Sequence, residues 1–212
     1  MDIQIETTVH HALEGRWLLT HPFYRRWEAG ELSSEELARY AEQYRYFEAY
    51  LPEFLAQLAT SLNEGTALNS VLANLGDEVA EPSHLELFDT FADEFGAGPS
   101  DCSPAMTALL DAYRSALEEG GPTAMAALAA YEVQSSDIAQ SKRDGLAAHY
   151  GATSTALEFW TVHATVEEDH AAWTLEGLAS LSPSRDDVVR GVTSVANGWW
   201  KFLDERESLA LV

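Results

Sequence analysis

Residues 33–51 read SSEELARYAEQYRYFEAYL, and they show most directly which secondary structure the chain adopts. Ser33 and Glu36 have the Ser-x-x-Glu spacing of a capping box, in which two side chains satisfy free backbone N–H groups where a helix begins. Apolar and aromatic residues then recur every three or four positions, which is the spacing of one helix face. They are Leu37, Tyr40, Tyr44, Phe47 and Leu51. We therefore predict a long helix that begins near Ser33.

The same helical periodicity occurs on both sides of this stretch. Gly-Pro and Ser-Pro pairs separate several of the periodic segments, and no alternating strand with a hairpin turn is found. We predict an all-α chain in which residues 1–212 form a single domain, a bundle of about seven or eight helices. The further helical segments run over about 8–19, 67–79, 84–95, 105–117, 123–150, 155–181 and 186–203.

The chain is strongly acidic. Its 35 Asp and Glu residues outnumber its 12 Lys and Arg residues, which gives a formal net charge of −23. This charge repels phosphates and anionic lipid headgroups, so we expect no nucleic-acid partner and no membrane partner. Lysine is scarce, with only Lys142 and Lys201, and many acids fall on the solvent faces of the predicted helices. We interpret this pattern as a halophilic adaptation, in which salt screens the repulsion.

Cysteine usage and the N-terminal residues indicate a compartment. The single cysteine, Cys102, excludes an internal disulfide and every cysteine-based zinc motif. The first residues lack the basic and apolar regions of a signal peptide, and no apolar run is long enough to span a membrane. We predict a cytoplasmic protein.

Polar residues on a buried helix face point to a site in residues 159–173, FWTVHATVEEDHAAW. At about 100° per residue, His163, Glu167 and His170 lie within roughly 40° of one another on the apolar face. A buried carboxylate without a partner is unfavourable, so this trio needs compensation, and a bound metal cation would supply it. The alternative is a hydrogen-bonded His-Glu-His network or a helix face along a wet cleft.

Further carboxylates and a histidine occur on other helices. Glu132 interrupts an apolar helical run, Glu78 lies at a helix end on the same side as Val71 and Leu75, and His84 opens the next helix. Imidazoles and hard oxygens without thiolates suit iron or manganese better than structural zinc, although ligand types alone leave zinc open. Two metals could share the six side chains and leave positions for dioxygen, even though the chain lacks the Glu-x-x-His pairs of typical carboxylate di-iron bundles.

These motifs resemble those of a known family. Residues 74–78 (NLGDE) with His84, residues 131–134 (YEVQ) and residues 162–170 (VHATVEEDH) are similar to the metal motifs of the haem-oxygenase-like di-iron oxidases, relatives of the TenA and PqqC folds. Residues 21–32 and 138–151 resemble most the subgroup that includes the chlamydial protein associating with death domains. The resemblance extends from about residue 20 to 203.

The resemblance implies a set of metal ligands and two cofactors. It implies two iron ions, or one iron and one manganese, with dioxygen as co-substrate. Two departures from the family pattern are present. His84 follows Glu78 by six positions where seven is expected, which a one-residue loop deletion could absorb, and Glu167 stands where Asp is usual, a longer carboxylate that weakens the second metal site. The ligands implied are Glu78, His84, Glu132, His163, Glu167 and His170.

In this subgroup the resemblance implies an oxygen-dependent route to para-aminobenzoate, for folate synthesis, in which the protein's own side chains are consumed. Tyr24 matches the tyrosine that supplies the ring, Tyr40 matches a second tyrosine, and Lys142 matches the lysine that supplies the amino group. The alternative for Tyr24 is an aromatic residue that packs at a helix start. Lys142 is more informative, because the chain has so few lysines. Relatives on this fold imply a homodimer.

Other functions compete with this oxidase. A TenA-like thiaminase would need a catalytic cysteine within residues 131–136, which have none, and an Asp after Gln43, where the chain has Tyr44. A metal-free PqqC-like oxidase that acts on a small molecule would leave the buried carboxylates unexplained. A non-enzymatic regulatory protein is a further alternative, but no helix-turn-helix with a basic recognition face is found.

Overall fold

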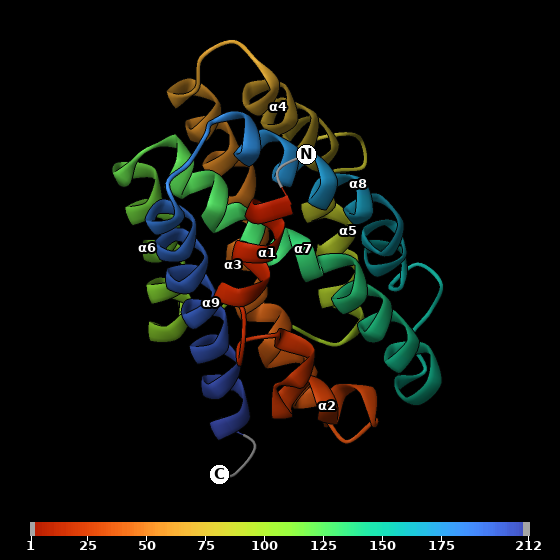
Figure 1. Cartoon of the computed structure of the whole chain (residues 1–212). Coiled ribbons are helices and arrows are strands. Elements are labelled where there is room, and N and C mark those ends of the chain that lie inside the picture. Colours follow the sequence, from red (N-terminus) through yellow and green to blue (C-terminus); the bar gives the residue numbers. More distant parts are fainter. Residues whose placement is uncertain (1–2, 210–212) are drawn as a thin grey trace.

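The structure is a computed structural model that describes residues 3–209, without the side chains of residues 3 and 166–169. Within this range the chain forms helices and no strands, which confirms the all-α prediction (Figure 1). The helices are α1 (Ile3–Ala12), α2 (Pro22–Glu28), α3 (Ser34–Ser61), α4 (Thr66–Glu78), α5 (His84–Glu94), α6 (Pro104–Glu119), α7 (Gly121–Gly145), α8 (Glu158–Ser180) and α9 (Arg185–Ser208). A 3-10 turn (Leu18–Thr20) and a π-helical turn (Leu146–Tyr150) complete the list.

Capping boxes fix the starts of three helices. The predicted one is present before α3: the Glu36 N–H group donates to Ser33 Oγ at 3.2 Å, and the Ser33 N–H group donates to Glu36 Oε2 at 2.7 Å. Ser83 caps α5 and Ser184 caps α9 in the same way. Because a capping box ends the preceding loop at a defined residue, the box at Ser83 places His84 as the first residue of α5.

The first helices differ from the predicted segments. The periodicity over residues 8–19 predicts one helix, but α1 ends at Ala12 and Leu18 begins a separate 3-10 turn. Gly15 lies between them with φ of 73°, a conformation that favours glycine and interrupts a helix. The apolar periodicity also did not predict α2, because seven residues are too few to show a helical period, although a helix start at Tyr24 was one of the alternatives. With α2 added to the eight predicted segments, the described range contains nine α-helices.

Helix α7 is the central helix of the bundle. It runs through the middle of Figure 1 and packs against α8, α9, α6 and α2. Residues 123–132 of α7 are all buried, as expected for a helix that is apolar on every side and covered by neighbours. On α9, a Cβ atom at Gly191 would lie 2.4 Å from the carbonyl oxygen of Thr123, so this close approach requires glycine. Polar side chains of α7 are therefore held inside the core.

Aromatic side chains of α3 fill the space between α7 and its neighbours. The Tyr44 ring lies 5.2 Å from Phe88 on α5, 6.1 Å from Trp160 on α8 and 5.7 Å from Trp199 on α9, measured between ring centroids. Phe47 packs in the same way against Tyr131 on α7. In the part of the chain that the structure describes, no helix has the length and apolar character needed to cross a bilayer.

Candidate metal centre

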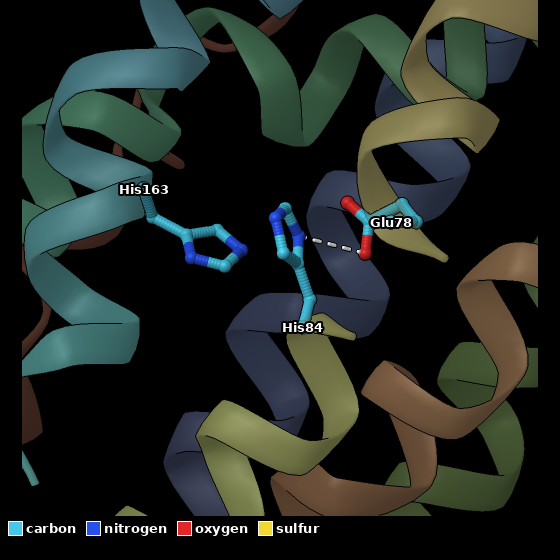
Figure 2. Close-up of side chains that lie close together, drawn as sticks. All are labelled: Glu78, His84 and His163. Atoms are coloured by element: carbon cyan, nitrogen blue, oxygen red, sulfur yellow. Dashed lines mark ion pairs between the residues drawn. The ribbon is translucent and has the colours of Figure 1, made fainter. Parts of the chain in front are cut away.

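Glu78, His84 and His163 form a buried cluster of possible metal ligands. They come from the end of α4, the start of α5 and the middle of α8, and each offers one ligand atom within 4.8 Å of the others. Their exposed fractions are 3%, 5% and 7%. Figure 2 shows the His84 ring between the His163 ring and the Glu78 carboxylate, both of which point toward it. Three predicted ligands, which are far apart in the sequence, thus meet at one point.

The contact between Glu78 and His84 is not an ordinary hydrogen bond. Glu78 Oε2 lies 3.0 Å from His84 Nδ1, the dashed line of Figure 2, yet His84 Nδ1 is a buried atom without hydrogen-bond geometry to any described partner. The two atoms thus lie close together without a hydrogen bond between them. Two ligands of one cation approach each other in the same way. The loop of residues 79–83, one residue shorter than the family pattern predicts, therefore still brings His84 to Glu78.

His163 is held in a form that can bind a metal. Its Nδ1 atom lies 2.7 Å from the carbonyl oxygen of Phe159, so Nε2 is left for the cluster. Burial, first, and then the neighbouring His84 hold the pKa of His163 well below its ordinary value. The side chain is therefore neutral at physiological pH, and a neutral imidazole is the form that ligates metals.

Glu132 and His170 are buried but do not belong to the three-residue group. Glu132 is 4% exposed, and its Oε1 atom accepts a hydrogen bond of 2.9 Å from the Asn74 side chain, one turn before Glu78 on α4. His170 is fully buried, and its Nε2 atom lies 3.0 Å from Asp77 Oδ2, next to Glu78 in the sequence. His170 also contributes to the lowered pKa of His163. Glu167, the sixth predicted ligand, lies outside the described side chains.

Glu48 is a buried acid of this region that the sequence prediction missed. It lies on α3, is 3% exposed, and feels the charges of Glu78 and Glu132. Burial, first, and then Glu78 raise the pKa of Glu48 well above its ordinary value. The signal was present in the sequence: Glu48 follows Tyr44 by four residues and so falls on the apolar stripe of that helix.

Lys142 lies in an aromatic chamber, which we define as the rings of Tyr24, Trp27, Tyr40, Tyr44 and Trp160. Lys142 is 1% exposed. Its Nζ atom lies between 4.3 Å and 5.8 Å from the five ring centroids. Burial holds the pKa of Lys142 well below its ordinary value, and only the charge of Glu48 acts in the opposite direction. The chamber therefore favours the neutral form of the amine, which has a free lone pair.

Tyr40 connects Lys142 to Tyr24. Lys142 Nζ donates to the Tyr40 hydroxyl at 2.6 Å, and the hydroxyl groups of Tyr40 and Tyr24 lie 3.0 Å apart. Both tyrosines are buried, and burial raises the pKa of each well above its ordinary value. The three residues that the resemblance singled out thus form one hydrogen-bonded group of neutral side chains.

The residues present fit a metal ion. His84 Nδ1, Asn74 Oδ1 and Glu48 Oε2 are buried and lack a hydrogen-bond partner among the described residues. Unsatisfied buried polar atoms are unfavourable, and a cation held by the cluster would satisfy His84 Nδ1. The donors are imidazole nitrogens and oxygens without sulfur, which suits iron or manganese. Cys102 lies elsewhere, in the loop before α6, where its sulfur accepts a hydrogen bond from Thr107.

A recess of about 250 Å³ reaches the cluster from the surface. His84, Leu87 and Val162 line it, and Asp77 and Glu158 add two carboxylates. The recess brings solvent to the edge of the His84 ring. Small molecules such as dioxygen therefore have a short path to the ligand cluster.

Comparison with known proteins identifies the family. The sequence profile of the Haem_oxygenas_2 family, described as "iron-containing redox enzyme", matches residues 38–203. A 4-aminobenzoate synthase of Nitrosomonas europaea is 34% identical over 216 residues, which cover 92% of this chain and 88% of that protein. A 4-aminobenzoate synthase of Chlamydia pneumoniae is 28% identical and covers 90% of this chain and 89% of its own length.

Solved structures show the same fold at low sequence identity. A protein of Shewanella denitrificans, described as having a heme oxygenase-like fold, gives a TM-score of 0.79 at 16% identity and covers 100% of this chain and 94% of its own. A TenA homologue of P. horikoshii gives 0.73 at 16% identity, with 95% and 97% covered. These comparisons confirm the resemblance to the haem-oxygenase-like oxidases. The chain belongs to the family of iron-containing redox enzymes with a haem-oxygenase-like fold, and it is an oxidoreductase.

Proposed function

We propose that this chain forms 4-aminobenzoate from its own side chains, with Tyr24 as the source of the ring and Lys142 as the source of nitrogen. The observation that carries the proposal is the position of Lys142. Its Nζ atom lies 4.7 Å from the centroid of the Tyr24 ring, in a chamber where burial keeps the amine neutral. The relatives named 4-aminobenzoate synthase support the same product.

The chemistry of the product matches these two side chains. In 4-aminobenzoate the carboxyl carbon lies para to the nitrogen, as Cβ lies para to the hydroxyl group of tyrosine. The Cα–Cβ bond of Tyr24 breaks and Cβ is oxidised to the carboxylate, while a bond to the Lys142 nitrogen replaces the phenol C–O bond. The Cε–Nζ bond of the lysine breaks as well. Tyr24 Cα takes a hydrogen and remains as a glycine residue, and Lys142 Cε, having lost its nitrogen, is oxidised to an aldehyde. The phenol oxygen leaves as water, and the new oxygen atoms of the carboxylate and the aldehyde come from dioxygen or water. Two molecules of dioxygen, with two electrons and two protons from an external thiol reductant, balance the reaction and yield two molecules of water in total.

The residues around Lys142 prepare this reaction. A neutral amine can form a bond to carbon, whereas an ammonium group cannot, so the burial of Lys142 has a direct chemical use. Tyr40 holds the lysine through a hydrogen bond and lies within 3.0 Å of the Tyr24 hydroxyl, so it can carry a proton between the two reacting groups. The aromatic walls exclude water, which would compete for reactive species.

We propose two metal ions, both iron or one iron and one manganese, with dioxygen as the co-substrate. Glu78, His84 and His163 would hold them together with Glu132 and His170, and Glu167 completes the proposed set. When bound, the metal pair would activate dioxygen for the oxidation. Asn74 and the Phe159 carbonyl orient Glu132 and His163, as the partners of metal ligands commonly do.

Isotope labelling tests the proposed function. The protein is produced with ring-¹³C tyrosine and ¹⁵N lysine, loaded anaerobically with Fe(II), with or without Mn(II), and exposed to oxygen with a thiol reductant. We expect 4-aminobenzoate that carries both labels, at no more than one molecule per chain. Peptide mass analysis is expected to show the matching losses at Tyr24 and Lys142.

Matched variants locate the source of each label. Tyr24→Phe is expected to abolish the product and to leave metal content unchanged. Tyr46→Phe is the control, because the Tyr46 hydroxyl donates to the Ser100 carbonyl outside the chamber. Unlabelled product, or product from Tyr24→Phe at the wild-type level, would show that the ring comes from another molecule.

We also propose that the protein works as a cytoplasmic homodimer in a cell with high internal salt. The net charge of −23 and the exposed acids support the salt adaptation, and the family resemblance supports the dimer. Sedimentation analysis measures the assembly, and thermal unfolding in dilute buffer and in molar KCl measures the salt effect. Equal unfolding temperatures in the two buffers would contradict the halophilic interpretation.

A further inference from the structure

We propose that Glu48 is a further oxygen ligand of the metal pair, supplied by α3. The inference rests on the proposed function, because it assumes that metal ions bind beside Glu78 and Glu132. Glu48 lies in the middle of α3, one helical turn after Tyr44 and on the same buried face. Helix α3 packs against α4, which ends with Glu78, and against α5, which begins with His84.

Groups of two other helices act on the Glu48 carboxyl group. After burial, the strongest influences on its pKa are Glu78 at the end of α4, which raises it, and Tyr44, which lowers it. Lys142 and then Glu132, both on α7, act more weakly. The Glu48 carboxyl group therefore lies near side chains of both the ligand cluster and the aromatic chamber.

The Glu48 carboxyl group has an oxygen available to a metal. Glu48 Oε2 is buried without a hydrogen-bond partner among the described residues, and Tyr44, one helical turn earlier, lowers the pKa of Glu48. In Glu132, the Asn74 side chain holds one oxygen. Carboxylates that bind metals commonly use one oxygen for the metal while a neighbouring donor orients the other.

The charge of the region gives an independent reason. Glu48, Glu78 and Glu132 bring three carboxyl groups from three helices into one buried space, each at most 4% exposed. Burial lowers the pKa of the nearby Lys142 amine and so disfavours its positive charge. Three buried acids without a cation are strongly unfavourable as carboxylates. Divalent cations in contact with all three would supply the missing positive charge.

A crystal structure with manganese tests the assignment directly. The full-length protein is crystallised without oxygen, soaked in Mn(II), and its anomalous scattering is measured to place each ion. We expect a Glu48 oxygen within about 2.0–2.3 Å of one Mn(II), the usual length of a bond between such a cation and a carboxylate. Manganese sites in which Glu48 lies beyond about 3 Å from every ion would overturn the proposal and leave the proposed function standing.

Metal titration in solution gives a second measure. Free Mn(II) is followed by its electron paramagnetic resonance signal in the wild type, in Glu48→Gln and in Glu53→Gln. Glu53 is an exposed acid of the same helix, so its variant makes the same change of charge away from the site. We expect Glu48→Gln to weaken one of two Mn(II) sites by at least about 10-fold, and Glu53→Gln to match the wild type. Unchanged binding in Glu48→Gln would contradict the assignment.

Two outcomes separate this inference from its premise. If the wild type binds no metal at all, the proposed function fails and the inference fails with it. If the wild type binds two ions that Glu48 does not contact, only the inference fails. Should Glu48→Gln not fold, as judged by circular dichroism, the manganese-soaked wild-type crystal decides alone.

Discussion

The ligand cluster and the aromatic chamber are adjacent buried regions whose reactive groups are paired differently, although Trp160 Nε1 in the chamber wall also lacks a hydrogen-bond partner within the described chain. In the cluster, His84 Nδ1 and Asn74 Oδ1 have no hydrogen-bond partner within the described chain. In the chamber, the hydroxyl groups of Tyr24 and Tyr40 and the amine of Lys142 are joined by hydrogen bonds. The cluster is therefore built for an external ion, whereas the chamber already contains its reacting groups. Changes in one region should leave the other intact.

The largest effect is expected from Lys142→Met, which removes the amine and keeps an unbranched apolar side chain. Product should fall below detection, because no nitrogen donor is left, while metal content stays at the wild-type level. Quantitative mass spectrometry of 4-aminobenzoate and metal analysis measure the two quantities. Lys201→Met changes the chain's other lysine, which is exposed, and is expected to retain activity. Product from Lys142→Met would show that the nitrogen has another source.

The next largest effect is expected from His163→Gln, which changes the cluster alone. Loss of a side chain that only orients a metal ligand weakens metal binding by roughly 10- to 100-fold. Loss of the ligand itself should weaken iron binding by more than this. Anaerobic Fe(II) titration measures this affinity, with His11→Gln as control because His11 is exposed on α1. The chamber should be unaffected, so the near-ultraviolet circular dichroism of its tyrosines and tryptophans should match the wild type. Iron binding at the wild-type level would remove His163 from the ligand set.

A smaller effect is expected from Tyr40→Phe, which breaks the connection inside the chamber. The change leaves Lys142 and Tyr24 without the hydroxyl group that joins them, at a cost of about 1–3 kcal/mol in the free energy of unfolding. Product formation should slow by about 10- to 100-fold if Tyr40 carries a proton between them. Single-turnover assays at several pH values measure the rate. An unchanged rate with reduced stability would give Tyr40 a structural role only.

Most of the fold could be predicted from the sequence, because helices leave local signals. The capping box at Ser33 and the stripe that starts at Leu37 both belong to one element, so residues close in sequence were enough to place α3. The error in the predicted helix over residues 8–19 also has a local cause. Gly15 interrupts it, so α1 ends earlier than the apolar periodicity implied. The sequence could not show which helix faces meet, since packing such as that of Gly191 on α7 depends on distant residues.

The site was predicted in part, for the same physical reason. Polar residues on apolar stripes identified Glu78, Glu132 and His163 one helix at a time. Glu48 satisfies the same criterion but lies in a helix with many surface acids, which hid it. The walls around Lys142 come from α2, α3 and α8, so no local pattern could reveal that burial keeps this amine neutral.

The smallest expected effect concerns the pH dependence of stability, and it distinguishes the chamber from the cluster. The pKa of Lys142 is lowered in the folded state, so the unfolded chain binds an extra proton at every pH between the folded pKa and the ordinary value of 10.5. Stability from this group therefore rises with pH across that window, with a slope of up to about 1.4 kcal/mol per pH unit. Lys142→Met should lose this slope in the part of the window just below pH 10.5.

Denaturant unfolding of the metal-free wild type and of Lys142→Met measures the difference in slope, and the other titrating groups cancel in that difference. His163→Gln should keep the slope above pH 7, because the lowered pKa of His163 affects stability only below its ordinary value of 6.5. Parallel curves for the wild type and Lys142→Met would mean that the lysine is charged in its chamber. The chamber would then hold a cation against aromatic rings instead of a nucleophilic amine, and the contrast with the ligand cluster would be lost.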